Sequence, residues 1–497
     1  MTDPLLALSP VDGRYAGHTA ALRDHLSEQA LLRHRVVIEV EWLIELAGED
    51  SVPHLRRLSA DEIAWLRAVA AGFTTADARR IKEIELSTRH DVKAVELYLR
   101  ERLAGTSLAD VVEWVHFGCT SEDISNLAYA RMIRDALDRV WLPAAEELVD
   151  VVATLAREHR ALPMTGRTHG QPATPTTVGK ELAVFAHRWR RQLRAVRGVE
   201  HLGKFGGAIG AFNAHVAAYP DVAWPSIARR FVERLGLVWN PLTTQIESHD
   251  WLVELMHAVQ RFNAVLRDFV GDMWLYLCLG VLRLRPVAGE VGSSTMPHKV
   301  NPAAFENAEA NVALSSGLLD TLARELPVSR LQRDLSDSAK LRAFGTALGH
   351  SLIALRSAKA GALRLVPDER ATAAELGGAW ELLAEPVQTV MRKNGLADGY
   401  QRVKDFCGGG VDRERLHALI RSLGLPRQDE QALLELTPAT YVGLAAELVD
   451  ALTSADAMAE STSDNSRKAL AANAARTSPD TPAGSPPASR NNPATTG

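Results

Sequence analysis

Apolar residues recur at helical spacing over a long stretch in the middle of the chain. No proline interrupts the sequence between Pro241 and Pro286. If the run is continuous, it predicts a helix of about 35 residues that is roughly 50 Å long. Helices of this length are typical of bundles, coiled coils and membrane spans, and the polar face of this one excludes the span. The apolar positions are Leu252, Leu255, Met256, Val259, Phe262, Leu266, Phe269 and Met273.

Two other long periodic runs, 176–201 and 303–326, predict further long helices, so we expect an all-α fold built on a central bundle. One face of this bundle is expected to pack against other subunits. Medium helices fill the first part of the chain, where Ser59 to Glu62 has the form of a capping box. The predicted domains are N-terminal helical (1–110), central long-helix bundle (111–365) and C-terminal helical (366–452).

The composition changes after this third helical part. From Thr453 to Gly497 the only large apolar residues are Met458 and Leu470. A segment with so few apolar side chains cannot offset the entropy lost on ordering, so we predict a disordered tail over 453–497.

Charge and cysteine content narrow the function classes. The net charge of −5 argues against a general nucleic-acid binder. The three cysteines show no CxxC spacing, which disfavours a zinc site or a disulfide framework. The N-terminus lacks a signal-peptide pattern, and the most apolar stretch, 273–282, is too short to span a bilayer. These features predict a cytoplasmic protein with no membrane or nucleic-acid partner.

The densest candidate chemistry lies in the run from Gly289 to Pro302, GEVGSSTMPHKVNP. A glycine and two serines precede Lys299, and Asn301-Pro302 is expected to open the next helix. A helix start and a lysine together make an anion site, where a serine alkoxide would be favoured. Read alone, the Gly-Ser-Ser part is also compatible with a flexible linker between two helices.

A second motif, RTHGQPATP, holds His169 in a turn bounded by glycine and proline, just before a long helix. Histidine titrates near neutrality and can transfer a proton, although a capping histidine is an equal alternative. His90, in TRHDVK, stands at a helix start and is either structural or a ligand contact.

The run HFGCTSED places hydroxyls ahead of acidic residues, which is an ordinary N-cap or a carboxylate-binding helix start. We expect Cys119 in this run to be packed rather than reactive. In SPVDGRY, a turn carries Arg14 and Tyr15. Ser338 and Arg342, four residues apart, share a helical face and either pair at the surface or meet an anion.

These motifs resemble those of a known family. GSSTMPHKVNP is similar to the signature loop of the fumarase/aspartase superfamily, whose members release fumarate by β-elimination. RTHGQPATPTT, HFGCTSEDISN, TRHDVKAVE and SPVDGRY resemble the adenylosuccinate lyases, in the bacterial form with a longer N-terminal region. The resemblance extends from about Ser9 to Leu452. It implies action on adenylosuccinate and on SAICAR in purine nucleotide biosynthesis, without metal or cofactor.

The resemblance also implies roles for individual residues. Ser293 matches the general base, His169 the general acid, Lys299 the residue that stabilises the carbanion-like intermediate, and Glu306 the partner of the catalytic histidine. The positions that match or adjoin substrate contacts are Arg14, Tyr15, Arg89, His90, Asp91, Thr120, Ser121, Gln245, Ser294, Val300, Asn301, Asn307, Arg333, Ser338 and Arg342. Arg89 departs from the pattern, because a small amide is expected beside the histidine. It either adds a phosphate contact or points away.

The family further implies a homotetramer with a core of twenty helices, in which three subunits build each active site. This would explain why the motifs are scattered along the chain. Two alternatives remain at this point. One is a sister lyase of the superfamily acting on another succinyl compound, and the other is a non-catalytic helical scaffold that has kept the fold.

Overall fold

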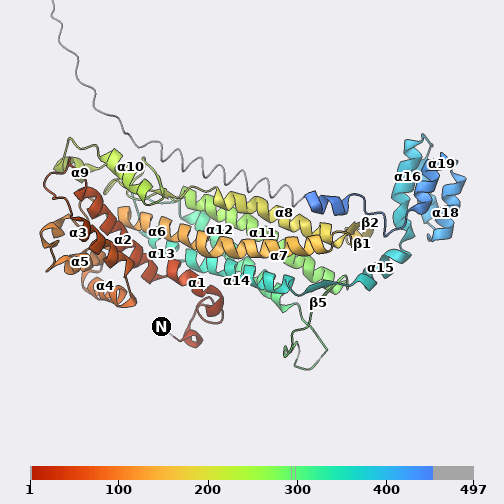
Figure 1. The fold of residues 1–497 in the computed structure, drawn as a ribbon, viewed down its shortest axis with the longest axis horizontal. Helices are drawn as coiled ribbons and strands as arrows, with labels where there is room; N and C mark the ends of the chain where they lie inside the picture. The colour runs from red at the N-terminus through yellow and green to blue at the C-terminus, as the bar shows by residue number, and fades with distance from the viewer. Residues whose placement is uncertain (1–2, 293, 297, 452–497) are drawn as a thin grey trace, which may run out of the picture.

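The computed structural model describes residues 3–292, 294–296 and 298–451, and it is an elongated, mostly helical molecule (Figure 1). Helices account for 65% of the structure, which confirms the all-α class. The predicted tail, 453–497, lies outside the described residues. No described helix is both long enough and apolar enough to cross a membrane.

Five long helices form the central bundle. They contact one another in the closed order α7, α8, α11, α12, α14 and back to α7, and their inward faces fill the core. α6 continues into α7 through a π-helical turn, η3, which lies next to Pro143. Proline has no N–H to donate, so the regular bonding pattern is interrupted there. The bounds are α6 (Ser121–Ala136), η3 (Leu137–Trp141), α7 (Leu142–Glu158), α8 (Val178–Arg197), α11 (Asp250–Cys278), α12 (Ala303–Glu325) and α14 (Phe344–Ala362).

The long helix predicted between Pro241 and Pro286 is present as α11, but it is shorter than expected. It begins after His249, which has a left-handed backbone with φ 65°, and it ends before Gly280, with φ 74°. Both residues reverse the chain before either proline is reached. The eight apolar positions that predicted the helix are all buried. At about 1.5 Å per residue, α11 is roughly 44 Å long.

The N-terminal helices pack onto one end of the bundle (Figure 1) and share a continuous hydrophobic core with it. The capping box predicted at Ser59 and Glu62 is present at the start of α3. These elements are η1 (Pro4–Leu6), α1 (Ala16–Leu26), α2 (Glu28–Ala47), α3 (Ala60–Ala71), α4 (Thr75–Thr88), α5 (Asp91–Leu103) and η2 (Ala109–Trp114).

The C-terminal helices lie at the opposite end (Figure 1) and have a separate small core that includes Leu383, Met391 and Ile420. The division of the chain into three domains, 1–110, 111–365 and 366–452, stays a prediction. The helices are α15 (Glu369–Gly378), η4 (Trp380–Leu383), α16 (Ala384–Lys393), α17 (Gly399–Cys407), α18 (Arg413–Ser422) and α19 (Arg427–Glu435).

The described strands are short and form three two-stranded sheets. β1 (Pro163–Thr168) and β2 (Gln171–Thr177) form an antiparallel hairpin, β3 (Leu202–Gly203) and β4 (Val238–Trp239) pair in parallel, and β5 (Leu282–Leu284) and β6 (Leu365–Pro367) pair antiparallel. The remaining helices are α9 (Asn213–Ala218), α10 (Trp224–Arg234) and α13 (Ser336–Arg342).

Candidate functional site

The residues singled out in the sequence lie in three places within one chain (Figure 1). His169 is at the tip of the β1–β2 hairpin, the signature run precedes α12 with Tyr15 beside the first turns of that helix, and the remaining motifs gather near the starts of α5 and α6. The helical run from Ser121 to Glu158 separates the first place from the third. At about 1.5 Å per residue, that run is roughly 55 Å long. A single chain therefore does not bring His169 together with the motifs at the other end.

The hairpin presents His169 to solvent. His169 and Gly170 have φ of 54° and 75°, and they form a two-residue loop between the paired residues Thr168 and Gln171. Two positive φ values in succession are the signature of a tight hairpin turn, and glycine adopts the second without strain. The sequence predicted a turn here, but not the strands that flank it.

Two contacts hold the hairpin against the C-terminal helices. Arg167 forms an ion pair with Glu375 of α15, and the Thr174 hydroxyl donates to Glu385 of α16 at 2.5 Å. The His169 side chain makes no hydrogen bond or ion pair to any residue that the structure describes, and it is exposed. The imidazole is therefore placed by its backbone and is free to meet another group.

The signature run forms a loop that closes at the base of α12. The side-chain amide of Asn301 donates to the carbonyl of Gly292. A Cβ atom at Gly292 would lie 1.8 Å from the carbonyl oxygen of Lys299, so only glycine fits. Ser294, Lys299 and Val300 are exposed on this loop. Ser293, the predicted base, lies outside the described residues. As predicted, Asn301-Pro302 leads directly into α12.

The first turns of α12 meet the N-terminal segment. The Tyr15 hydroxyl donates to Oδ1 of Asn307 at 2.7 Å, and Nδ2 of Asn307 donates to the Ser357 hydroxyl at 2.7 Å. The Arg14 guanidinium lies 5.9 Å from the centre of the Tyr15 ring. The exposed Glu306 carboxylate accepts from Trp274 Nε1 at 3.2 Å. Arg14, Tyr15 and Asn307 are therefore neighbours within one chain.

His90 and Asp91 open α5 beside the start of α6. His90 caps α5, because its Nδ1 accepts from the Lys93 amide at 3.1 Å, and its Nε2 lies 3.4 Å from the Ser121 hydroxyl. Asp91 pairs with the buried Arg35 at 2.8 Å. Although burial opposes it, the charge of Arg35 lowers the pKa of Asp91. The Asp91 carboxylate therefore stays ionised, and its neighbour His90 lies within reach of Ser121.

Arg89 adopts a left-handed backbone with φ 53° at the end of α4. Asparagine tolerates this conformation well, which is a physical reason for the small amide that the motif leads one to expect there. The Arg89 side chain is exposed and makes no hydrogen bond or ion pair with the described part of the chain.

Arg333 and Gln245 meet next to the start of α6. Arg333 Nη2 lies 2.8 Å from the Glu122 carboxylate, and Nη1 donates to Gln245 Oε1 at 3.1 Å. Burial raises the pKa of Glu122, while the Arg333 charge opposes this. The Thr120 amide donates to Asp123 at 2.8 Å, which fixes the first turn of α6.

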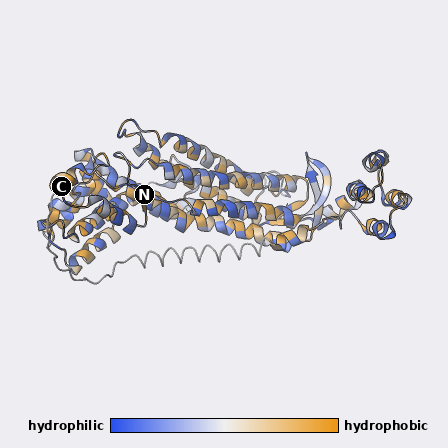
Figure 2. Ribbon diagram, turned by 90° about the horizontal axis from the view of Figure 1, so that it is seen from above, coloured by the Kyte–Doolittle hydropathy of each residue, from blue (hydrophilic) through white to orange (hydrophobic). Residues whose placement is uncertain are grey.

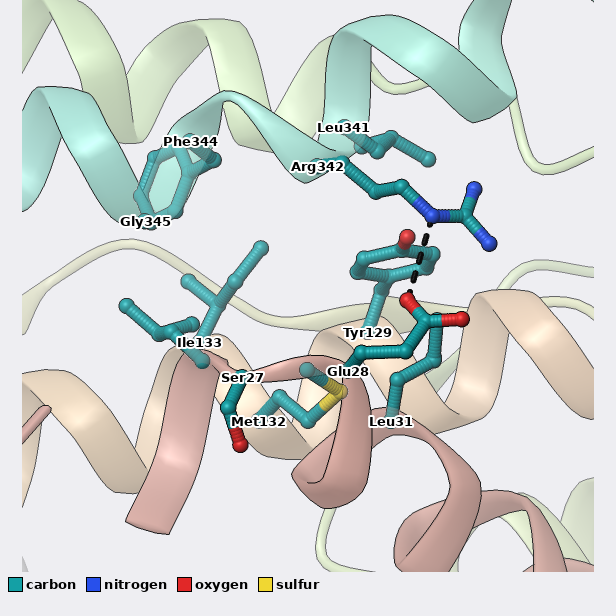
Figure 3. A pocket seen from close by; sticks show the side chains of 11 residues that line it. Ser27, Glu28, Leu31, Tyr129, Met132, Ile133, Leu341, Arg342, Phe344 and Gly345 are labelled. Atoms are coloured by element: carbon teal, nitrogen blue, oxygen red, sulfur yellow. Dashed lines mark hydrogen bonds and ion pairs between the residues drawn. The ribbon is translucent and has the colours of Figure 1, made fainter. Parts of the chain in front are cut away.

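Arg342 lies at the rim of a cavity of about 240 Å³ (Figure 3). Its Nη1 donates to the Ser338 hydroxyl at 2.8 Å, and its Nε donates to Glu28 at 3.2 Å. Asp91 lies 3.6 Å from the same guanidinium. The predicted Ser338–Arg342 pairing is therefore present, and the arginine also links two acidic groups. The Tyr129 hydroxyl is buried near Arg342, and burial raises its pKa to about 12.

Several neighbours of these residues were missed by the sequence analysis. Arg35 and Glu28 lie on α2 and carry no local motif, and Lys204 lies in a loop far along the chain. Only their through-space contacts identify them. Cys119 is packed as predicted, and burial raises the pKa of its thiol. Among the described residues, no group of three His, Cys, Asp or Glu side chains is arranged to hold a metal ion.

Comparison with known proteins assigns the family. A family model described as lyase matches residues 13–314, and one described as adenylosuccinate lyase C-terminal matches residues 329–442. The adenylosuccinate lyases of Vibrio cholerae and Escherichia coli K12 are each 48% identical to this chain, over 90% of its length and 99% of theirs. The chain belongs to the adenylosuccinate lyase family. The adenylosuccinate lyase of Haemophilus influenzae is 46% identical, with the same coverage.

The fold of this adenylosuccinate lyase family member is similar to those of two solved structures. A fumarate lyase from Mesorhizobium has a TM-score of 0.70 at 19% identity, covering 87% of this chain and 97% of that one. A 3-carboxy-cis,cis-muconate lactonizing enzyme from Pseudomonas putida has a TM-score of 0.67 at 24% identity, covering 88% and 96%. These two likenesses concern the fold alone. Family membership makes the protein a lyase, and it disfavours the scaffold alternative.

Proposed function

We propose that this lyase eliminates fumarate from adenylosuccinate and from SAICAR, in the cytoplasm, as a homotetramer whose active sites are shared between subunits. The observation that carries the proposal is the separation of the motifs. Residues that resemble one active site of the family lie at opposite ends of a helical run roughly 55 Å long. Such a set can act together only if different subunits contribute its parts.

The chemistry follows from charge and proton transfer. Loss of a proton next to a carboxylate builds negative charge, which Lys299 and the N–H groups at a helix start would stabilise. In this scheme Ser293 removes the proton from Cβ. His169 then protonates the departing nitrogen, a task suited to an imidazole, which can both donate and accept a proton. Glu306 is proposed to pair with the catalytic histidine in the assembled site.

The residues near the N-terminal helices are proposed to bind the anionic groups of the substrate. Arg333 and Arg342 are already held by carboxylates in the free chain, at 2.8 Å and 3.2 Å. A phosphate or carboxylate of the substrate would compete for these guanidinium groups and form charge-assisted bonds. His90, Asp91, Ser121 and Gln245 lie beside these arginines in the same chain. Arg14, Tyr15 and Asn307, together with the signature loop, would approach from a neighbouring chain.

The exposed surface of the bundle supports assembly. Large apolar side chains on α8, α11 and α12 remain exposed in one chain, including Trp274 (40%), Leu275 (52%) and Leu314 (53%). Hydrophobic positions run along the whole bundle (Figure 2). Apolar surface of this kind marks protein–protein contacts, and antiparallel packing of such helices from different chains would bury it and bring opposite ends together.

An ultraviolet assay tests the proposed activity. Purified protein is mixed with adenylosuccinate, and the loss of the succinyl-purine absorbance is followed. We expect turnover by the wild type, and a loss of at least a hundredfold in kcat for Ser293→Ala and for His169→Ala, because each removes one proton-transfer group. Substrate binding by both variants should persist, measured by equilibrium dialysis. A wild-type tetramer that is inactive on both substrates would contradict the proposal, and a panel of other succinyl compounds would then test the sister-lyase alternative.

A further inference from the structure

A fully buried ion pair lies directly beneath the start of α6. Lys204 Nζ is 2.7 Å from Oδ1 of Asp123, and neither residue is exposed. Removing two charges from water is costly unless their hydrogen-bonding capacity is satisfied. Here Lys204 also donates to the carbonyl of Gly207 at 2.7 Å, so the ammonium has a second hydrogen-bond partner besides Asp123.

The Asp123 carboxylate gathers backbone amides from two segments. It accepts from Thr120 at 2.8 Å, from Gly206 at 2.8 Å and from Gly207 at 3.0 Å. Asn126, one turn further along α6, exchanges hydrogen bonds of 2.8 Å and 2.9 Å with the backbone of Lys204. The loop 204–207 is therefore clamped onto the first turn of α6.

The clamp extends to the proposed substrate contacts. The carbonyl of Ala208, which follows the clamped loop, accepts from Gln245 Nε2 at 3.0 Å. Gln245 in turn accepts from Arg333, and Arg333 pairs with Glu122, the neighbour of Asp123. These contacts close a ring that begins and ends at the ion pair. The positions of Gln245 and Thr120, two proposed substrate contacts, therefore depend on the position of loop 204–207.

The Lys204–Asp123 ion pair also affects the electrostatic potential at the start of α6. The start of a helix attracts anions because its N–H groups are unpaired and its dipole is positive there. The Asp123 charge, two residues after Ser121, would repel an anionic substrate group in this low-dielectric surrounding. The Lys204 ammonium, 2.7 Å away, cancels that repulsion.

We propose that Lys204 is a positioning residue for the elimination reaction: it neutralises Asp123 beneath α6 and holds the loop that orients Thr120, Ser121 and Gln245 toward an anionic group of the substrate. This inference rests on the proposed function. Lys204 itself is buried and does not touch the substrate.

Two single substitutions separate charge compensation from simple packing. Lys204→Met leaves an uncompensated carboxylate under the anion site, so we expect KM for adenylosuccinate to rise at least tenfold, with a smaller fall in kcat. Asp123→Asn leaves an uncompensated cation there, so KM should stay level or fall. A purely structural pair predicts that both substitutions raise KM alike, and that result would overturn the proposal.

The double variant D123N/K204M provides the rescue. It removes both charges, and we expect it to recover most of the KM lost in Lys204→Met. Lys359→Met, which removes a lysine from the partly exposed pair with Glu147, is the matched control and should keep wild-type KM. If Lys204→Met does not fold, the inhibition constant of fumarate for Asp123→Asn decides, because weaker inhibition than in wild type would contradict charge compensation.

The outcomes also distinguish this inference from the proposed function. If wild type is active and Lys204→Met keeps the wild-type KM, this inference alone fails. If wild type is inactive, the proposed function fails.

Discussion

His34 and His215 are buried and His201 is half-buried at the N-terminal end of the core, and each has a ring nitrogen with no hydrogen-bond partner among the described residues. Burial lowers the pKa of His34 to about 3 and those of His201 and His215 to about 4. The ring of His215 is fully enclosed and packs edge-on against Trp42 and Trp224. Each of these side chains is therefore uncharged in the folded protein at neutral pH.

This has a consequence for stability against pH. In the unfolded chain such a histidine takes up a proton near pH 6.5, whereas folded His215 does so only near pH 4. Its contribution is complete above pH 6.5 and is lost as the pH falls from 6.5 toward 4, at about 1.4 kcal/mol per pH unit. We expect urea unfolding at pH 7.5 and 5.5 to show this loss in wild type and a smaller loss in His215→Phe.

The control for this measurement is His54→Phe, which replaces an exposed histidine and should retain the wild-type pH dependence. Protein concentration must be held constant, because assembly contributes to apparent stability. Equal pH dependence in His215→Phe and wild type would show that His215 is not the group responsible.

At the scale of elements, two short segments decide where the proposed catalytic groups stand. The β1–β2 hairpin carries His169 on a turn that is fixed by two positive φ values. The loop before α12 is fixed by the close approach of Gly292 to Lys299. Both devices rely on glycine, for different reasons: Gly170 for its backbone conformation and Gly292 for its lack of a side chain.

Gly292→Ala tests the loop. The added methyl group would overlap the Lys299 carbonyl, so the loop must shift and carry Lys299 with it. A displacement of about 1 Å at a catalytic group costs about a hundredfold in rate, and we expect kcat to fall by that order. The thermal midpoint should change little, since the loop is exposed. In the control Gly378→Ala, the added Cβ meets no atom within 4 Å and activity should be unchanged. Full activity in Gly292→Ala would show that the loop base does not position Lys299.

For the whole molecule, the distribution of residues along the bundle is the main observation. The β1–β2 hairpin, which carries His169, and α13, which ends at Arg342, lie at opposite ends of the bundle (Figure 1). Arg333 lies three residues before α13 and pairs with Glu122 of α6, so it is at the same end as Arg342. A shared active site therefore takes its acid from one chain and its arginines from another. A mixed tetramer of chains that lack His169 and chains that lack Arg342 can therefore still contain sites with both residues intact.

Mixing inactive variants tests the shared site. When His169→Ala and Arg342→Ala chains are combined in equal amounts and reassembled, roughly a quarter of the sites should receive both intact residues. We expect about that fraction of wild-type activity. The pair Arg333→Ala with Arg342→Ala should not recover, because every chain then lacks one residue of the same end. Failure of the first pair to recover, in a proven mixed tetramer, would contradict the shared site.

The sequence by itself determined the helical class, the positions of the long helices, the capping box at Ser59 and the motif residues, because apolar periodicity and helix caps depend on residues a few positions apart. It did not predict the early ends of α11, the hairpin around His169, or the partners Arg35, Glu28 and Lys204. Those depend on contacts through space, such as Lys204 with Asp123, between residues far apart in the chain. The tertiary structure alone decided which motifs meet and which are kept apart, because the helical run from Ser121 to Glu158, roughly 55 Å long, fixes the distance between its ends.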